Sequence, residues 1–168
     1  MDQNKVNNLN FCIILIVCTL VGGVLNLVNL PDWLFYFRPD WVALFVTFWV
    51  LSFPDKLSVF YGLLSGLFLD LILVKPLGLN AIGFVVLAYL VGYWSSQIRA
   101  LTLWQQCLFL VILLAFCKLL IGLAAILTTD FVFTRFYWYS ALGNFIFWPL
   151  LFMILQEVKQ AFLTEQNG

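Results

Sequence analysis

The sequence contains no histidine and few charges. Eight basic and eight acidic residues among 168 balance to a net charge of zero, which excludes a basic face for nucleic acid. Without histidine, the chain lacks the side chain most often used for acid–base catalysis near neutral pH. It also contains no G-x-S-x-G string and no glycine-rich phosphate loop after a strand. We therefore expect neither an enzyme nor a cofactor-binding protein.

Metal-binding patterns are absent as well. The four cysteines lie inside apolar runs and form no C-x-x-C pair, and no histidine is available to complete a zinc site. We expect all four to be small buried hydrophobic residues and predict no metal site. They are Cys12, Cys18, Cys107 and Cys117.

No polar stretch is long enough to form a soluble domain. Hydrophobic residues make up 64% of the chain, and no charge occurs between Lys5 and Asp32. A bilayer core about 30 Å thick needs about 20 apolar residues per helix. Only helices and closed barrels satisfy the backbone in lipid, and barrel strands would alternate polar with apolar residues. The runs here are continuous, so the sequence predicts an all-α, polytopic membrane bundle.

Six membrane-spanning segments are predicted within one integral membrane domain that covers residues 1–168. The segments are residues 9–28, 41–53, 57–74, 79–95, 103–127 and 136–155. Residues 1–8 and 157–168 are expected to be polar tails, and residues 96–102 a loop. The second segment has only 13 residues and would rise about 20 Å. Either the bilayer thins around it or it is re-entrant.

An even number of spans places both termini on one side of the membrane. The first apolar run has no cleavage site after it and should remain as an anchor. Basic residues slightly favour the terminal side, which indicates cytoplasmic termini by the positive-inside rule. Lys5, Lys56, Arg99 and Lys159 lie on that side, and Arg38, Lys75 and Arg135 on the other.

The third segment carries a face of small residues that ends in an acid. Gly62, Gly66 and Asp70 follow one another at four-residue spacing, which places them on one face of a helix. A G-x-x-x-G pair lets another backbone approach closely. Ordinary packing within the bundle is the more frequent role of such a pair. A contact surface for a partner protein is the functional alternative, and we assign it to Gly62 and Gly66.

Asp70 and Lys118 are the two charges placed inside the predicted spans. An ionised side chain in lipid costs several kcal/mol unless it is paired, hydrated or neutralised. The two lie at similar depths if the third and fifth segments run in the same direction, so an ion pair between them is the preferred interpretation. A proton or ion pathway would need more ionisable groups. Independent snorkelling is the remaining alternative.

Two further groups of polar residues are candidates for contacts. Asn144, in the sixth segment, could donate or accept a hydrogen bond between helices. Before the second segment, aromatic residues suit the membrane interface, and we predict an interfacial loop that includes Arg38, Pro39, Asp40 and Trp41.

Several short strings, taken in order, resemble one protein family. They are residues 37–42 (FRPDWV), 62–71 (GLLSGLFLDL), 77–80 (LGLN), 88–91 (AYLV) and 103–106 (LWQQ). Together with the length and hydropathy, they resemble MreD, the rod shape-determining membrane proteins of bacteria. The resemblance extends from about residue 31 to the C-terminal tail.

The resemblance implies a non-enzymatic subunit of the elongation machinery in the bacterial inner membrane, surrounded by membrane lipid. Its implied partner is MreC and, through MreC, the MreB filaments, a RodA-type glycosyltransferase and a class B penicillin-binding transpeptidase. It also implies the six-helix arrangement of the substrate-binding subunits (S-components) of vitamin transporters.

Two functions are therefore expected as alternatives. The preferred one is a scaffold that binds the transmembrane helix of MreC. The other is a small-molecule-binding or transporter subunit, in which Asp70, Asn80, Lys118 and Asn144 would converge on a pocket near mid-membrane. Co-purification with a single-span partner, without a bound ligand, would distinguish the two.

Overall fold

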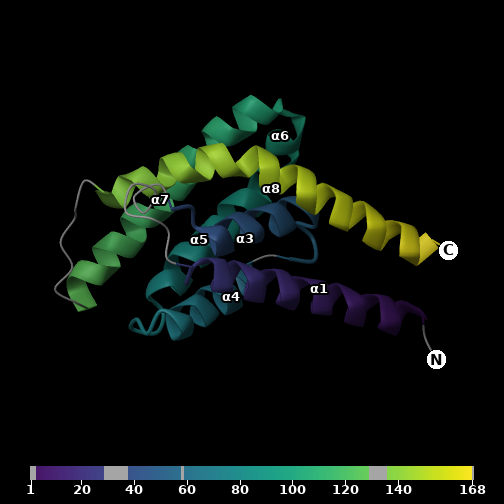
Figure 1. The fold of residues 1–168 in the computed structure, drawn as a ribbon, viewed down its shortest axis with the longest axis horizontal. Helices are drawn as coiled ribbons and strands as arrows, with labels where there is room; N and C mark the ends of the chain where they lie inside the picture. Colours follow the sequence, from purple (N-terminus) through teal and green to yellow (C-terminus); the bar gives the residue numbers. More distant parts are fainter. Residues whose placement is uncertain (1–2, 29–37, 58, 129–135, 168) are drawn as a thin grey trace.

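The part of the chain that the structure describes is built of α-helices alone, as predicted. The computed structural model describes residues 3–28, 38–57, 59–128 and 136–167. Figure 1 shows the helices, which are α1 (Gln3–Leu25), α3 (Trp41–Ser52), α4 (Val59–Ile72), α5 (Leu79–Tyr93), α6 (Ser95–Ala100), α7 (Leu103–Thr128) and α8 (Phe136–Asn167).

Helices occupy all six segments expected from hydropathy, with three differences at their ends. The predicted N-terminal tail is helical from Gln3, and α8 continues through the predicted C-terminal tail to Asn167. The predicted loop 96–102 begins with the short helix α6. This helix forms because Trp94 closes α5 by donating its N–H to the Leu90 carbonyl, while Ile98, which is buried, donates to the carbonyl of Trp94.

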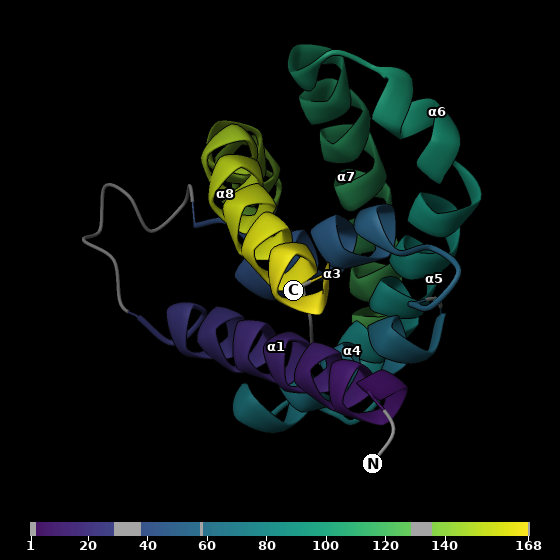
Figure 2. The same cartoon turned by 90° about the vertical axis from the view of Figure 1, so that its right-hand side faces the viewer.

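Helix α3 is the core of the molecule. Its residues 42–51 are all buried, and they are apolar on every side of the helix apart from Thr47. A helix that is hydrophobic all round must be surrounded by protein or lipid. Viewed from the side of the chain ends, α3 lies between α1, α4, α5 and α8 (Figure 2). The segment with the shortest apolar run is thus the central helix.

Aromatic contacts hold the outer helices on α3. The ring of Phe48 lies 5.7 Å from that of Phe152 in α8. Trp49 lies 6.1 Å from Phe11 in α1, edge to face. Such pairs stabilise packing by about 0.5–1.5 kcal/mol beyond the area they bury. The first and the last helix therefore both pack on the centre of the fold.

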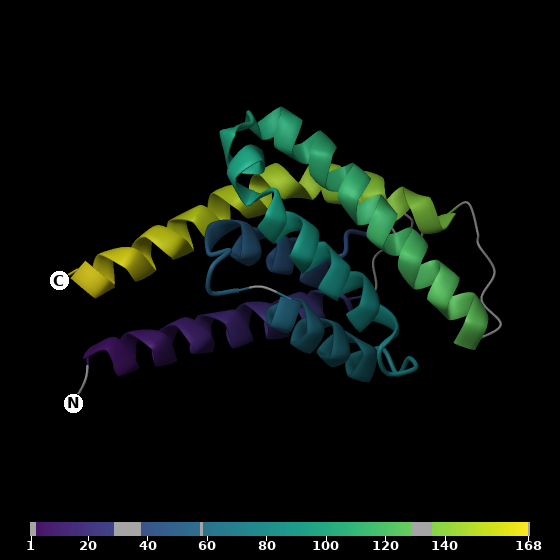
Figure 3. The same ribbon diagram turned by 180° about the vertical axis from the view of Figure 1, so that it is seen from behind.

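One helix of the described residues, Leu103–Leu127 within α7, is long and apolar enough to cross a membrane. Figure 3 shows this helix running across the back of the molecule beside α5. The start of α1 and the end of α8 lie at the same end of the molecule (Figure 1). The number of crossings and the cytoplasmic orientation of the termini both stay predictions. Residues 29–37, Asp130 and Arg135 lie outside the described residues.

The cysteines only partly follow the prediction. Cys107 and Cys117 are buried and Cys18 is partly buried, but Cys12 is exposed. Cys12 is exposed because it lines an open groove between α1 and α4 instead of a packed contact. All four cysteines are free thiols.

Candidate functional site

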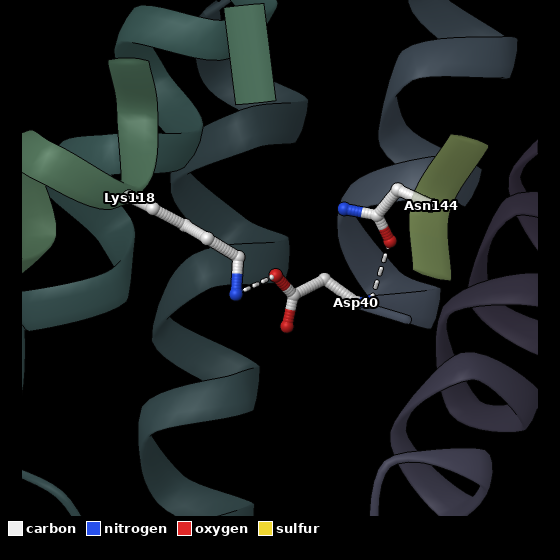
Figure 4. Close-up of polar contacts among 3 residues, drawn as sticks. All are labelled: Asp40, Lys118 and Asn144. Atoms are coloured by element: carbon white, nitrogen blue, oxygen red, sulfur yellow. Dashed lines mark hydrogen bonds and ion pairs between the residues drawn. The ribbon is translucent and has the colours of Figure 1, made fainter. Parts of the chain in front are cut away.

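Asp40 connects three helices at the start of α3. Its carboxylate Oδ2 lies 2.7 Å from Nζ of Lys118 in α7. Its backbone N–H donates a hydrogen bond of 2.8 Å to Oδ1 of Asn144 in α8. Figure 4 shows the lysine and the amide reaching Asp40 from different helices. We refer to Asp40, Lys118 and Asn144 as the charged junction.

The local sequence explains why Asp40 is available for this contact. Asp40 is the N-cap of α3, and its carbonyl accepts the N–H of Leu44 to begin the helix. Its carboxylate makes no capping hydrogen bond, so Oδ2 is available to pair with Lys118 of α7. A negative charge is also favourable beside the positive end of a helix dipole. Trp41 packs on Phe147 with ring centroids 5.1 Å apart, which brings α8 close to the same point.

The charged junction corrects one sequence-based expectation. Lys118 was expected to pair with Asp70, but the carboxylate that it contacts belongs to Asp40. Lys118 meets Asp40 because α3 is the central helix, so the acid at its N-cap reaches the side chain of Lys118 on α7. Residues 38–41 were expected to form an interfacial loop. Residues 38–40 lie before α3 and Trp41 is its first residue; Pro39 is buried, the other three are partly buried, and their position at the membrane interface stays a prediction.

Asp70 fixes the turn between α4 and α5. The side chain is fully buried, and its carboxylate accepts three hydrogen bonds. Oδ2 accepts the backbone N–H of Gly78 at 2.9 Å. Oδ1 accepts the backbone N–H of Asn80 at 3.0 Å and its side-chain amide at 2.7 Å. Gly78 has a φ of 98°, which glycine adopts without strain. Asp70 thus satisfies donors at the first turn of α5, where orphan N–H groups are otherwise costly.

The charged junction and the Asp70 turn share one electrostatic environment through Lys75. Partial loss of solvent lowers the pKa of the Lys75 ammonium, the charge of Asp40 raises it, Lys118 lowers it and Asp70 raises it. Two carboxylates and two ammonium groups therefore interact within this part of the fold, and their formal charges sum to zero.

The glycine face of α4 is occupied by α5. A Cβ on Gly62 would collide with the carbonyl oxygen of Phe84 and would lie 2.8 Å from Cβ of Ala88. A Cβ on Gly66 would collide with Cα of Ala81 and would lie 2.8 Å from its nitrogen. The face that we assigned to a partner protein therefore serves close packing within the chain. Sequence alone could not distinguish the two uses, because both need the same small residues.

The four polar residues of the transporter interpretation do not converge on a cavity. Asp70 and Asn80 are bonded to each other at the α4–α5 turn, whereas Lys118 and Asn144 both bind Asp40. An apolar groove of about 400 Å³ lies elsewhere, between α1 and α4, and none of the four lines it. No group of three or more potential metal ligands occurs in the described part of the chain.

Neutralising Asp70 should weaken the fold. In Asp70→Asn, the new NH₂ group would face N–H groups that now donate hydrogen bonds to the carboxylate. A charge-assisted hydrogen bond is therefore lost, and a buried donor is left unsatisfied. We expect a loss of about 2 kcal/mol in the free energy of unfolding. Thermal unfolding of the purified protein in detergent measures the change. Asp55→Asn is the matched control, because Asp55 is exposed in the α3–α4 connection. Equal stability of the two variants would contradict the capping role of Asp70.

Comparison with known proteins agrees with the resemblance seen in the short sequence strings. The family model described as rod shape-determining protein MreD matches residues 6–158. The rod shape-determining protein MreD of Haemophilus influenzae is 32% identical over 144 residues, which cover 83% of this chain and 86% of that protein. No solved structure matches, so the likeness to transporter S-components stays a prediction. The match over nearly the whole chain shows that this protein belongs to the MreD family of rod shape-determining proteins.

Proposed function

We propose that this protein is a non-catalytic, multi-pass subunit of the bacterial inner membrane that supports rod shape by contacting MreC. Through MreC, it would help to assemble MreB filaments, a RodA-type glycosyltransferase and a class B penicillin-binding transpeptidase for lateral wall synthesis. Membership of the MreD family supports the role in cell shape. In this proposal the termini are cytoplasmic, as the slight excess of basic residues on the terminal side indicates.

The observation that carries the proposal is the use made of the interior charges. Asp40 and Lys118 hold α3 and α7 together, and Asp70 holds the first turn of α5. A proton relay or a substrate pocket would need ionisable groups that can release these contacts and exchange partners. Charges used in this way make the bundle rigid, which is what a scaffold requires. The protein would then act through the outer faces of its helices and through its short connections.

Complementation in living cells tests the proposal. In a rod-shaped bacterium that lacks its own MreD, cells should be round, and expression of this chain should restore rods. The chain should also co-purify with MreC after mild detergent extraction, because binding to MreC is the proposed basis of the shape effect. Cell width by microscopy and MreC recovery by immunoblot are the two measurements.

Two controls make the result specific. Asp55→Asn changes one exposed charge outside the charged junction and should restore both rods and MreC recovery. A variant that fails to accumulate, such as Gly66→Leu, should restore neither. Rods restored without any MreC in the complex, even after chemical cross-linking in intact cells, would show that the proposed contact is not the means of action.

A further inference from the structure

An apolar groove opens on the side of the molecule between α1 and α4. Its volume is about 400 Å³, within the range of small-ligand sites. Cys12, Ile16 and Leu20 line it from α1, and Leu64 and Phe68 from α4. Several of these side chains are widely exposed, so the groove is open along its length.

The few hydroxyl groups in the groove already have partners in the protein. Thr19 donates to the carbonyl of Leu15 at 2.8 Å, and its oxygen lies 3.0 Å from the hydroxyl of Tyr61. Ser65 donates to the carbonyl of Tyr61 one turn earlier in α4. An occupant therefore finds hydrocarbon walls and no unpaired hydroxyl group among these three residues. Such a surface suits an acyl chain, which has no hydrogen bonds to offer.

Two lysines lie where the groove meets the α3–α4 connection. Lys56 lines the groove, and its Nζ lies 5.8 Å from the ring centroid of Phe11. Nζ of Lys159 lies 5.5 Å from the ring of Phe53, and the two rings are 5.1 Å apart. Cation–π contacts of this kind hold ammonium groups in place while leaving their charge unbalanced.

These lysines have no carboxylate partner among the residues that the structure describes, where the one ion pair is that of Asp40 with Lys118. Burial lowers the pKa of Lys159, and the positive charge of Arg99 lowers it further. The charges of Lys159 and Arg99 therefore repel each other, and Lys56 is linked to Lys159 through the contact of Phe11 with Phe53. A bound anion would relieve this repulsion.

We propose that the groove and the pair Lys56 and Lys159 form a binding site for an anionic phospholipid. One acyl chain would lie along the groove between α1 and α4, and the phosphate would lie between the two ammonium groups. A phospholipid carries an anionic phosphate at one end of its hydrocarbon chains, which matches an apolar groove with lysines at one end. The alternative occupant is a transmembrane helix of another protein, about 10 Å wide. To neutralise the lysines, it would need an acidic residue at the level of Lys56 and Lys159. The lipid site is independent of the proposed function in cell shape.

Native mass spectrometry of the purified full-length protein tests the site. The protein in detergent is titrated with dioleoyl phosphatidylglycerol, which is anionic, or with dioleoyl phosphatidylcholine, which has no net charge. We expect a clear preference for phosphatidylglycerol. Removing both cations in Lys56→Gln/Lys159→Gln should lower phosphatidylglycerol affinity by about fivefold for each lysine, and should leave phosphatidylcholine unchanged. Arginine at both positions should recover the preference.

Matched variants separate the site from the rest of the surface. Lys75→Gln removes one cation at the α4–α5 turn, away from the α3–α4 connection (Figure 1), and should keep the preference. Leu64→Trp places bulk in the groove and should reduce phosphatidylglycerol binding, whereas Leu63→Trp, at the exposed neighbouring position that does not line the groove, should not. Elution volume and helicity of each variant check that it is folded.

Three results would overturn the lipid assignment. The first is equal affinity of the wild-type protein for the two lipids. The second is equal phosphatidylglycerol binding by folded Leu64→Trp and Leu63→Trp. The third is efficient cross-linking of Leu64→Cys to the membrane helix of another protein in cells, together with lipid binding that Leu64→Trp leaves intact. That combination would assign the groove to a protein helix.

Discussion

Replacing Gly66 by leucine is expected to remove the folded protein from the membrane. The first atom of the new side chain would collide with the backbone of Ala81 in α5, and a backbone within a helix cannot turn aside as a side-chain tip can. Overpacking typically costs 1–3 kcal/mol, and we expect about 3 kcal/mol or more here because the contact is with main-chain atoms. The amount of protein in the membrane fraction, and its elution as a monodisperse species in detergent, measure the effect.

A glycine elsewhere in the same pair of helices provides the control. A Cβ on Gly92, in α5, would lie 3.8 Å from Cγ1 of Val50, which is ordinary van der Waals contact. Gly92→Ala should therefore accumulate normally and gain about 0.5–1 kcal/mol from helix propensity. Gly66→Ala makes the same chemical change at the crowded position and should lose stability. Normal accumulation of folded Gly66→Leu would mean that α4 and α5 do not approach as described.

Breaking the charged junction is expected to have the second large effect. In Asp40→Asn, Lys118 would lose the carboxylate at 2.7 Å while its own side chain stays mostly buried, 12% exposed. Removing one partner of a buried ion pair costs about 3–5 kcal/mol. Because Asp40 is 34% exposed, we expect the lower end, about 3 kcal/mol. The midpoint of thermal unfolding in detergent measures the loss.

A double-mutant cycle tests whether the two charges act on each other. Lys118→Met removes the buried cation, so Asp40→Asn should cost much less in the Lys118→Met background than alone. The exchange Asp40→Lys/Lys118→Asp should recover part of the stability of the single variants. Strictly additive losses would show that the pair contributes nothing as a pair. Asp70→Asn combined with Lys118→Met is the comparison cycle, and it should be nearer to additive, because Asp70 is held by Gly78 and Asn80.

The positions of the helices were predictable because continuous apolar runs mark segments that avoid water, whether they pack on protein or face lipid. The segments of residues 41–53, 79–95 and 103–127 each contain a helix that matches within two residues. The ends of α1 and α8 were not predictable in this way, since their polar residues continue helices that hydropathy had ended. Helix α6 was missed because it is short and because the burial of Ile98 depends on tertiary packing.

The candidate site was predictable in its residues and less so in its contacts. Asp70, Lys118 and Asn144 were recognised as polar groups in apolar helices, where each needs a partner. The partners depend on which helix lies at the centre, and nothing in the sequence ranks the helices by depth in the bundle. A central α3 brings Asp40 to Lys118, and the turn residues Gly78 and Asn80 are close enough to satisfy Asp70 locally.

The central place of α3 has a consequence for biosynthesis. This helix is among the first to leave the ribosome, yet one of its sides is completed by α8, the last. The N–H of Asp40 finds its acceptor 104 residues later, on Asn144, and Phe48 finds the ring of Phe152. During translation α3 is thus a short apolar helix without its final neighbour. The packing around α3 can be completed only after α8 has left the ribosome.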